Sequence, residues 1–569
     1  MSNISTQEYN KLRDEKTSSY EFRERRQATW QDIYDLYRGK SKTNRLTQRQ
    51  AVHIPLMKET IKTALSKIDD APSVVFREKT GDQQKDLYIT EEWNSDYNRL
   101  NLEIKDIQDK KNVLLFGRSF TKLNWYNNDF DCDILDVYDI HLDPKTDPSD
   151  IETARWVRHD NIFRTYKEIM ASPRYSKEGK RRLSLFIGTQ EGKKMSSYNR
   201  EVLEERQRRM QDMGVKNYDK LEGADTLLNL SEHFTYTWSN KAQKWVKYLY
   251  TMATDEICLL KAPLKRVIGI DSYPFVSWAD DIDTMDFWTD GAGDVAQIIN
   301  KIINIYFSQM VENRTIKNMG MFWYMPKEGY IPPTIEPAQY AMLPAPSVQG
   351  QSIDQVIKQV QVPDLDSNRD EIAFLMDLVS RALATTAIER GEGEKKQITL
   401  GEVQILAQKS SQRFVSIAKF YRKKWKQLIE KWYEMKNANT PNNSKKNLFK
   451  LDSEGKLWNK DVYAKDWKSK AGYDIEIASS AQQEEEKMSA IQRLMLVKNQ
   501  FPNNQVLQEA MQRSMLEITS LSTETISRIL EAEKNMQEQQ AQMMQQQNQE
   551  EGQLQNNILQ GMNELKSLA

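Results

Sequence analysis

The sequence has few of the residues from which metal sites and disulfide frameworks are built. Its 569 residues include two cysteines, Cys132 and Cys258, which form no C-x-x-C pair. At most one intrachain disulfide is possible, so neither a disulfide scaffold nor a zinc site is expected. The four histidines stand singly, without ligand spacing: His53, His141, His159 and His233. We therefore predict no metal site and no cofactor.

Long apolar runs are also absent. No stretch reaches the roughly 18 residues that a membrane helix needs, and the mean hydropathy is -0.75. The best candidate, residues 295–310, is interrupted by Gln297, Asn300, Lys301 and Asn304. We interpret it as a buried or intersubunit helix. The N-terminal segment has no apolar core and no small-residue cleavage site, so we expect intracellular assembly without secretion.

An excess of charge of either sign is missing. The chain has 82 acidic and 81 basic residues, which gives a net charge of -1. A protein that grips nucleic acid through a large basic surface would have a strongly positive balance. The composition is instead compatible with a conduit along which nucleic acid slides.

Phosphate-binding motifs are present only as fragments. "RGKSK" ends like a phosphate loop, but Tyr34 occupies the position of the first glycine. "GAGDVA" matches G-x-G-x-x-A at Gly291, Gly293 and Ala296, yet an acidic, polar segment precedes it. Asp294 would repel a pyrophosphate and is better explained as a favourable charge at a helix N-terminus. We therefore predict no nucleotide site.

An acidic run is the remaining candidate for a site: Asp280, Asp281, Asp283, Asp286 and Asp290. Its spacing lacks the glycine and terminal glutamate of a calcium loop, so we predict a solvated acidic turn. The motifs H-E-x-x-H and G-x-S-x-G do not occur. We predict no catalytic residues and no enzymatic activity.

The first half of the chain alternates helical and extended patterns. A helix face is formed by Trp30, Ile33, Tyr34 and Tyr37, and Pro55 opens a second helix. A period of two from Thr121 to Trp125, a turn at "YNNDFD" and an extended stretch at 134–142 predict an antiparallel hairpin. Thr165 and Glu168 form a capping box that starts a helix. Further strands are predicted at 154–159, 233–238, 244–250 and 256–261, with an exposed helical insertion at 191–220.

The second half has an order of elements that is more specific. A long helix over 291–318 has apolar residues on more than one face, which predicts packing on two sides: Val295, Ile298, Ile299, Ile302, Ile303 and Tyr306. A proline-rich block, 319–365, follows as a loop-and-strand module. A helix over 366–384, a charged loop with two glycines and a long helix over 398–435 come next. The long helix carries an apolar face: Phe414, Ile417, Ala418, Tyr421, Trp425, Leu428 and Trp432.

This order resembles the portal proteins of tailed bacteriophages, the rings through which DNA enters and leaves the capsid. "LLFGRSFTKLNW", "DVYDIHLDPKT" and "ARWVRH" are similar to the family's wing sheet, although Val137 stands where the family pattern has proline. "YDIEIASSAQQEEEKMSAIQRLM" is similar to the strand and helix that lead into the crown. The resemblance covers about residues 30–521. Each motif is loose, and the order of the motifs carries the likeness.

The resemblance implies an α+β, predominantly helical subunit with wing, stem, clip and crown, and with a small antiparallel wing sheet. It divides the chain into an N-terminal wing region (1–290), a first stem helix (291–318), a clip (319–365), a second stem helix (366–384), a tunnel loop (385–397), the long wing helix with returning strands (398–483), crown helices (484–535) and a glutamine-rich C-terminal segment (536–569). The last segment is either an ordered helical barrel or a disordered tail.

The implied tunnel loop combines mobility with charges of both signs: Glu389, Arg390, Gly391, Glu392, Gly393, Glu394, Lys395 and Lys396. Repeated around a ring, its basic residues could touch phosphates briefly while its acids prevent tight capture. The alternative is an ordinary linker between two helices.

The resemblance also implies partners and a location. A homo-oligomeric ring, dodecameric in the family, would let double-stranded DNA through at one capsid vertex of the virion, after assembly in the host cytoplasm. It would dock the terminase large subunit, the major capsid or scaffold protein, and a head-tail adaptor. Two alternatives stay open: another phage head or tail structural protein, such as a minor capsid or scaffold component, and a metal-dependent nucleic-acid enzyme that uses the acidic clusters.

Overall fold

A computed structural model describes residues 4–39, 52–66, 68, 73–126, 128–187, 227–239, 243–253, 255–320, 322–324, 342–344, 358–359, 367–382, 400–451 and 457–478. The chain divides into two compact units: Met1–Ser444 with Tyr463–Ile477, and Lys445–Val462 with Ala478–Ala569. The predicted insertion at 191–220, tunnel loop at 385–397, crown at 484–535 and glutamine-rich segment at 536–569 lie outside the described residues.

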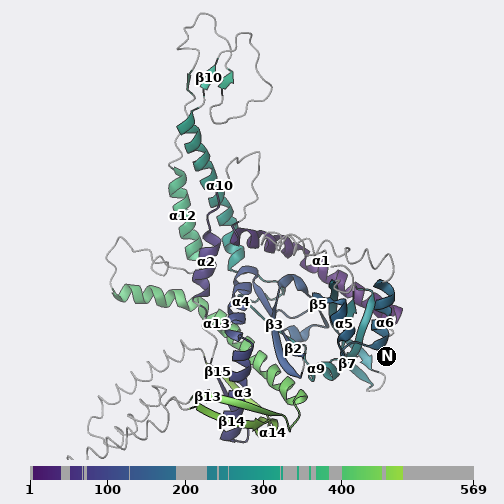
Figure 1. The fold of residues 1–569 in the computed structure, drawn as a ribbon. Helices are drawn as coiled ribbons and strands as arrows, with labels where there is room; N and C mark the ends of the chain where they lie inside the picture. The colour runs from purple at the N-terminus through teal and green to yellow at the C-terminus, as the bar shows by residue number, and fades with distance from the viewer. Residues whose placement is uncertain are drawn as a thin grey trace, which may run out of the picture. The chain divides into compact units, whose positions relative to one another are not determined.

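Four helices form the N-terminal part of the first unit: α1 (Thr6–Tyr37), α2 (Leu56–Leu65), α3 (Gln83–Arg99) and α4 (Leu102–Phe116) (Figure 1). Helix α1 begins at a capping box in which Ser5 and Glu8 each accept the other's backbone N–H. Trp30 and Ile33 of α1 are fully buried, as the helical spacing predicted. The second helix begins directly after Pro55, also as predicted.

A three-stranded antiparallel sheet has the order β3-β2-β9, with β2 at Arg118–Tyr126, β3 at Asp129–Leu135 and β9 at Phe275–Ala279. The predicted hairpin is therefore present, but its second strand begins at Asp129 and not at 134. Asn128 closes the turn in the left-handed region, with φ 62°, so pairing resumes immediately after it. A short 3-10 turn, η1 (Val137–Asp139), then interrupts the stretch predicted as continuously extended.

A five-stranded antiparallel sheet has the order β4-β5-β6-β7-β8. Its strands are β4 (Ile140–Leu142), β5 (Trp156–Thr165), β6 (Leu227–Ser239), β7 (Lys244–Ala253) and β8 (Ile257–Pro263). The strands predicted here are confirmed. So is the capping box of Thr165 and Glu168, which starts α5 (Tyr166–Ala171). Short helices α6 (Lys177–Ile187) and α9 (Leu264–Ile268) and the turn η2 (Ile151–Thr153) complete this part.

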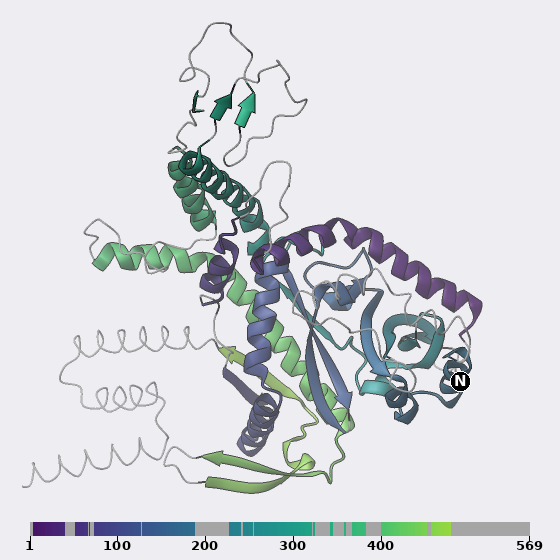
Figure 2. The same cartoon turned by 45° about the horizontal axis from the view of Figure 1, so that its top comes forward.

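Two long helices form an antiparallel hairpin: α10 (Ala292–Met319) and α12 (Ser367–Ala382) lie side by side in both views (Figures 1 and 2). Both helices match the predicted ranges within two residues. Of the chain between them, the structure describes three short strands, which form a sheet of order β11-β10-β12: β10 (Phe322–Tyr324), β11 (Met342–Pro344) and β12 (Lys358–Gln359).

The long helix predicted after the charged loop is present as α13 (Leu400–Asn439). Strand β1 (Ser73–Glu78) pairs with β15 (Tyr473–Ala478), and α14 (Ala464–Trp467) precedes β15. In the second unit, β13 (Lys445–Leu451) pairs with β14 (Leu457–Tyr463). The fold is α+β, as predicted, and its three-stranded β3-β2-β9 sheet and its five-stranded sheet are antiparallel, whereas β10 and β11 pair in parallel. Among the described helices, none combines the length and the hydropathy that a bilayer span requires.

Candidate functional site: the helical hairpin and its base

The base of α10 crosses α4 at three glycines. Gly117 ends α4 with φ +82°, and a Cβ there would lie 2.0 Å from the carbonyl oxygen of Thr289. A Cβ on Gly291 would lie 2.6 Å from the Gly117 nitrogen, and one on Gly293 2.5 Å from the Leu115 oxygen. Because no side chain fits, the glycines of "GAGDVA" serve close packing of the two helices.

Asp294 occupies the N-terminus of α10, where a phosphate would have to bind. Its carboxylate accepts the Gly291 N–H at 2.9 Å and pairs with Arg26 of α1 at 2.9 Å. A negative charge at this helix end is favourable. Asp294 thus has the role that the sequence predicted for it, a favourable charge at a helix N-terminus.

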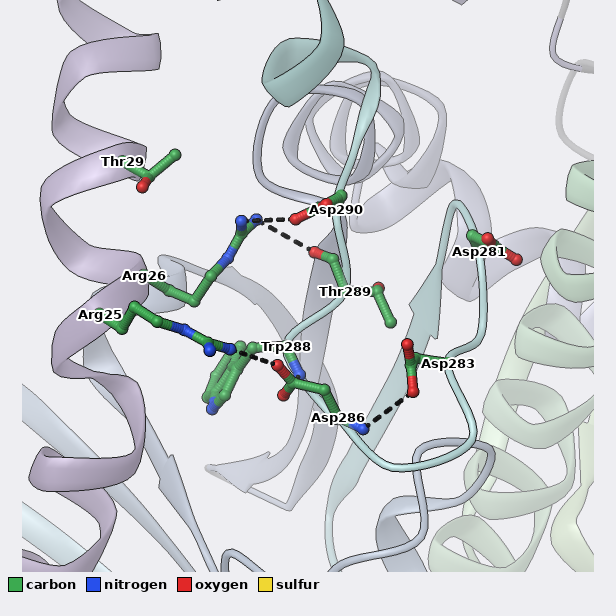
Figure 3. A pocket seen from close by; sticks show the side chains of 9 residues that line it. All are labelled: Arg25, Arg26, Thr29, Asp281, Asp283, Asp286, Trp288, Thr289 and Asp290. Carbon is green, nitrogen blue, oxygen red and sulfur yellow. Dashed lines mark hydrogen bonds and ion pairs between the residues drawn. The ribbon is translucent and has the colours of Figure 1, made fainter.

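The acidic run lies between β9 and α10 and faces α1 (Figure 3). Asp281, Asp283 and Asp290 are exposed, as the predicted solvated turn requires, while Asp280 and Asp286 are half-buried. Asp286 pairs with Arg25 at 3.1 Å, and Asp290 with Arg26 at 2.6 Å, because α1 carries two adjacent arginines past the loop. Burial also raises the pKa of half-buried Asp280 to about 7.

A cavity of about 420 Å³ lies between α1 and this loop, and its lining is charged: Arg25, Arg26, Thr29, Asp281, Asp283, Asp286, Trp288, Thr289 and Asp290. Much of that charge is already paired within the chain. Among the described residues, no group of three or more histidine, cysteine or acidic side chains is arranged to hold a metal ion.

A ladder of polar side chains fixes α10 to the first turn of α2 and to the segment before it. Asn300 accepts the Met57 N–H at 2.9 Å, and Asn304 accepts the Ile54 N–H at 2.9 Å. One turn further on, the Ser308 hydroxyl accepts the Val52 N–H at 3.0 Å. All three side chains are buried. The polar residues that interrupt the apolar pattern of α10 therefore supply acceptors for an adjacent backbone.

The apolar residues of α10 divide between two faces. Of the six predicted to pack, Ile303 is fully buried, while Ile299, Ile302 and Tyr306 are half-buried. Val295 and Ile298 are 43% and 62% exposed. Ile305, seven residues after Ile298, is 41% exposed and extends the same stripe. Packing on one side is thus satisfied within the chain, and the other side carries exposed apolar side chains.

Helix α12 has the same division. Ile372 and Val379 lie seven residues apart on one face and are buried. Phe374 and Leu378 lie on the opposite face and are 64% and 42% exposed. The hairpin therefore presents apolar side chains outward from both of its helices.

The C-terminal half of α13 is held by three buried lysines that the sequence prediction missed. Lys424, Lys431 and Lys436 are 2%, 9% and 4% exposed. Lys431 pairs with Glu152 at 2.6 Å, and Lys436 with Asp96 at 2.8 Å. The predicted apolar face is confirmed where side chains are described, since Tyr421, Trp425, Leu428 and Trp432 are buried beside these lysines.

Lys424 of α13 pairs with carboxylates of α4, one of which also bonds to the β3-β2-β9 sheet. Its ammonium group lies 3.3 Å from Asp106 and 3.2 Å from Asp109, both on α4. Asp109 also accepts from Ser119 of β2 at 2.7 Å and from Trp278 of β9 at 2.5 Å. Burial alone would lower the pKa of Lys424, but the two carboxylates raise it above its ordinary value. The spacing held a signal: Lys424 lies three residues after Tyr421 and four before Leu428, within the apolar face.

Two of the four histidines lie in one cluster, although they are far apart in the sequence. His141 of β4 and His233 of β6 both pair with Arg158 of β5 and face the same side of the sheet, whereas His159 of β5 pairs with Ile140 and Glu232 and faces the other side. All three are buried. Each receives a hydrogen bond from a cationic side chain: Arg23, Lys122 and Arg158, respectively.

Neither a scan against protein-family models nor a search among curated proteins finds a match to this chain. The predicted tunnel-loop residues, Glu389 to Lys396, lie outside the described residues.

Proposed function

We propose that this chain is the subunit of a portal ring, through which double-stranded DNA is packaged into and ejected from the capsid of a tailed bacteriophage. The support is the order of the described elements. A long helix, α10, is followed by short strands, an antiparallel helix, α12, and a forty-residue helix, α13. In the portal family that order corresponds to stem, clip, stem and wing.

The observation that carries the proposal is the exposure of apolar side chains on both outer faces of the hairpin. Ile298 of α10 and Phe374 of α12 are both more than 60% exposed in the single chain. If the α10 face of one copy packs on the α12 face of the next, the contact is heterologous and repeats around a closed ring. Burial of these side chains against a neighbouring copy would then complete the packing on two sides that the sequence predicted.

The remaining parts of the proposal follow from the family resemblance. The ring, twelvefold in the family, would occupy a single vertex of the virion, after assembly in the host cytoplasm. It would contact the major capsid or scaffold protein, and then the terminase large subunit and the head-tail adaptor in turn. ATP hydrolysis would belong to the terminase. The charges at 389–396 would line the channel and contact the DNA phosphates transiently.

The test is negative-stain electron microscopy of the purified chain and of two matched variants. Ile298→Glu places a charge on the outer face of α10. Ile104→Glu places the same charge on α4, at a residue that is 59% exposed and not part of the hairpin. We expect rings with a central hole near the width of duplex DNA for the unaltered chain and for Ile104→Glu. Ile298→Glu should give single subunits, because a charge buried between copies is costly.

The outcomes separate the proposal from its rivals. Compact particles without a channel from the unaltered chain would favour another head or tail structural protein. Magnesium-dependent cleavage of DNA would favour an enzyme. Rings that survive Ile298→Glu would show that the hairpin does not form the subunit contact.

A further inference from the structure

A buried charged cluster joins the N-terminal half of α1 to the five-stranded sheet. Arg158 of β5 lies at its centre and bonds to Asp160, to Asp255 and to the Nε2 atom of His233. From α1, Lys16 pairs with Asp255 at 2.6 Å. The cluster is therefore shared between one helix and three strands or strand ends.

His141 is the second histidine of the cluster. Arg23 of α1 donates to its Nε2 atom at 3.3 Å, and the ring's Nδ1 lies 3.4 Å from the hydroxyl of Ser19. Tyr20 stacks on the ring with 5.9 Å between centroids. The Asp160 carboxylate lies 3.5 Å from Nε2. Thus α1 covers His141 with three side chains that lie within about one helical turn.

The chemistry of arginine determines the state of both rings. A guanidinium group only donates, so a ring nitrogen that it contacts must accept. The Nε2 atoms of His141 and His233 are therefore unprotonated, and both imidazoles are neutral. Burial, and then the charges of nearby cations, lower the pKa of each well below its usual value. His233 has no described partner for its other ring nitrogen.

The charges of the cluster balance only while the histidines are neutral. Three cations face three carboxylates: Lys16, Arg23 and Arg158 against Asp139, Asp160 and Asp255. Two protonated imidazoles would add a charge of +2, and each would turn an N–H towards an arginine. We propose that this cluster is an acid-sensitive latch, which holds α1 on the five-stranded sheet at neutral pH and releases its N-terminal half on acidification.

The sign of the effect follows from where protons bind. Both histidines have a lower pKa in the docked state than the ordinary value near 6.5, so undocking takes up protons as the pH falls below about 6.5. Burial alone would raise the pKa of Asp255, but Arg158 and Lys16 hold it well below its usual range. Asp255 therefore stays charged at pH 5.

One group on α1 opposes this effect. Burial raises the pKa of Glu15, which faces Thr235 and Lys11, to about 7. Acidification from pH 7.5 to pH 5 therefore protonates Glu15 in the docked state and favours docking. The Glu15→Gln variant removes this opposing titration and is the background in which the latch is measured.

The test is amide hydrogen exchange of the full chain at pH 7.5 and pH 5.0, with each rate divided by the intrinsic rate at that pH. In the Glu15→Gln chain we expect the amides of residues 11–23 to exchange up to about thirtyfold faster at pH 5.0 for each histidine that titrates. Two internal references should stay unchanged. They are the amides of residues 26–33, where α1 is held by Arg26, and those of 424–436 in α13, whose buried lysines bond to carboxylates.

Replacing both histidines decides the matter. His141→Gln with His233→Gln retains an oxygen that accepts from arginine but does not titrate. We expect this variant to lose the pH dependence at 11–23. If that variant does not fold, His141→Gln and His233→Gln are measured separately. Each should show a smaller pH dependence of exchange at residues 11–23 than the chain with both histidines. Undiminished acid release in the variants, or equal acceleration at 424–436, overturns the latch. The result is independent of ring formation, which the electron microscopy tests separately.

Discussion

We call the sheets β3-β2-β9 and β4-β5-β6-β7-β8, together with α3, α4 and α13, the body. The body and the α10–α12 hairpin differ in the kind of side chain that they bury. The body encloses charged groups: Lys424 and Asp109 are both nearly inaccessible to water and pair with each other. The hairpin leaves Ile298 and Phe374 exposed. The body thus encloses paired charges within one chain, while the hairpin exposes apolar side chains on the outer faces of both of its helices.

The buried ion pairs of the body also restrict its geometry. Taking a lysine and a carboxylate out of water is expensive, so each pair is stable only where both groups find all their partners. Lys424, Lys431 and Lys436 meet carboxylates from α4, from η2 and from α3, respectively. Helix α13 can therefore satisfy all three only in one position along the body.

Asp109→Ala should have the largest effect, because it breaks the body's most connected pair. It leaves Lys424 short of one carboxylate and Trp278 without an acceptor, in a site closed to water. We expect the free energy of unfolding to fall by about 3–5 kcal/mol, measured by urea denaturation.

The control is Asp131→Ala, which removes a carboxylate that is 40% exposed and lies 3.7 Å from Lys105. An exposed pair of this kind contributes about 0–1 kcal/mol. Equal losses in the two variants would contradict the contrast between a body built on buried charge and an ordinary protein surface.

Local patterns predicted both helices of the hairpin and several strands of the body, but not α3, α4 or β9. They did not indicate the polar chemistry inside the body. Alternation located β6, β7 and β8, and apolar spacing located α10 and α12 within two residues. Lysine is almost never fully buried, so only the position of Lys424 within the apolar face of α13 indicated its burial, and nothing indicated its partners. Its partner Asp106 is 318 residues away in sequence. The histidine cluster likewise depends on the register that sets Arg158 opposite His233, which no local pattern specifies.

Asn300→Leu tests the contact between α10 of the hairpin and the first turn of α2. The variant keeps the size and helical character of the residue but leaves the buried Met57 N–H without its acceptor. The expected loss in the free energy of unfolding is about 1–3 kcal/mol. Gln309→Leu, an exposed amide on the same helix, is the matched control and should change stability little. Similar values for both would mean that the polar ladder does not fix α10.

The smallest effect on the single chain is expected at the outer face of the hairpin. Phe374→Ala removes a ring that is 64% exposed, so at dilutions where the chain is monomeric the free energy of unfolding should stay within about 0.5 kcal/mol. Ile372→Ala, two residues earlier on the buried face, should lose about 2–5 kcal/mol under the same conditions.

At concentrations where we expect the unaltered chain to form rings, Phe374→Ala should have the larger effect of the two variants, and the quantity affected is association between copies. Phe374→Ala should weaken association, because the phenyl group would pack on the α10 face of the next copy. Sedimentation velocity measures this association. Ile372→Ala should assemble as long as it is folded, since its side chain is already covered within its own chain. A Phe374→Ala chain that associates as strongly as the unaltered one would place the subunit contact elsewhere and remove the reason for the exposed apolar face. Stability and association therefore separate what the hairpin does for its own chain from what it does for a neighbour.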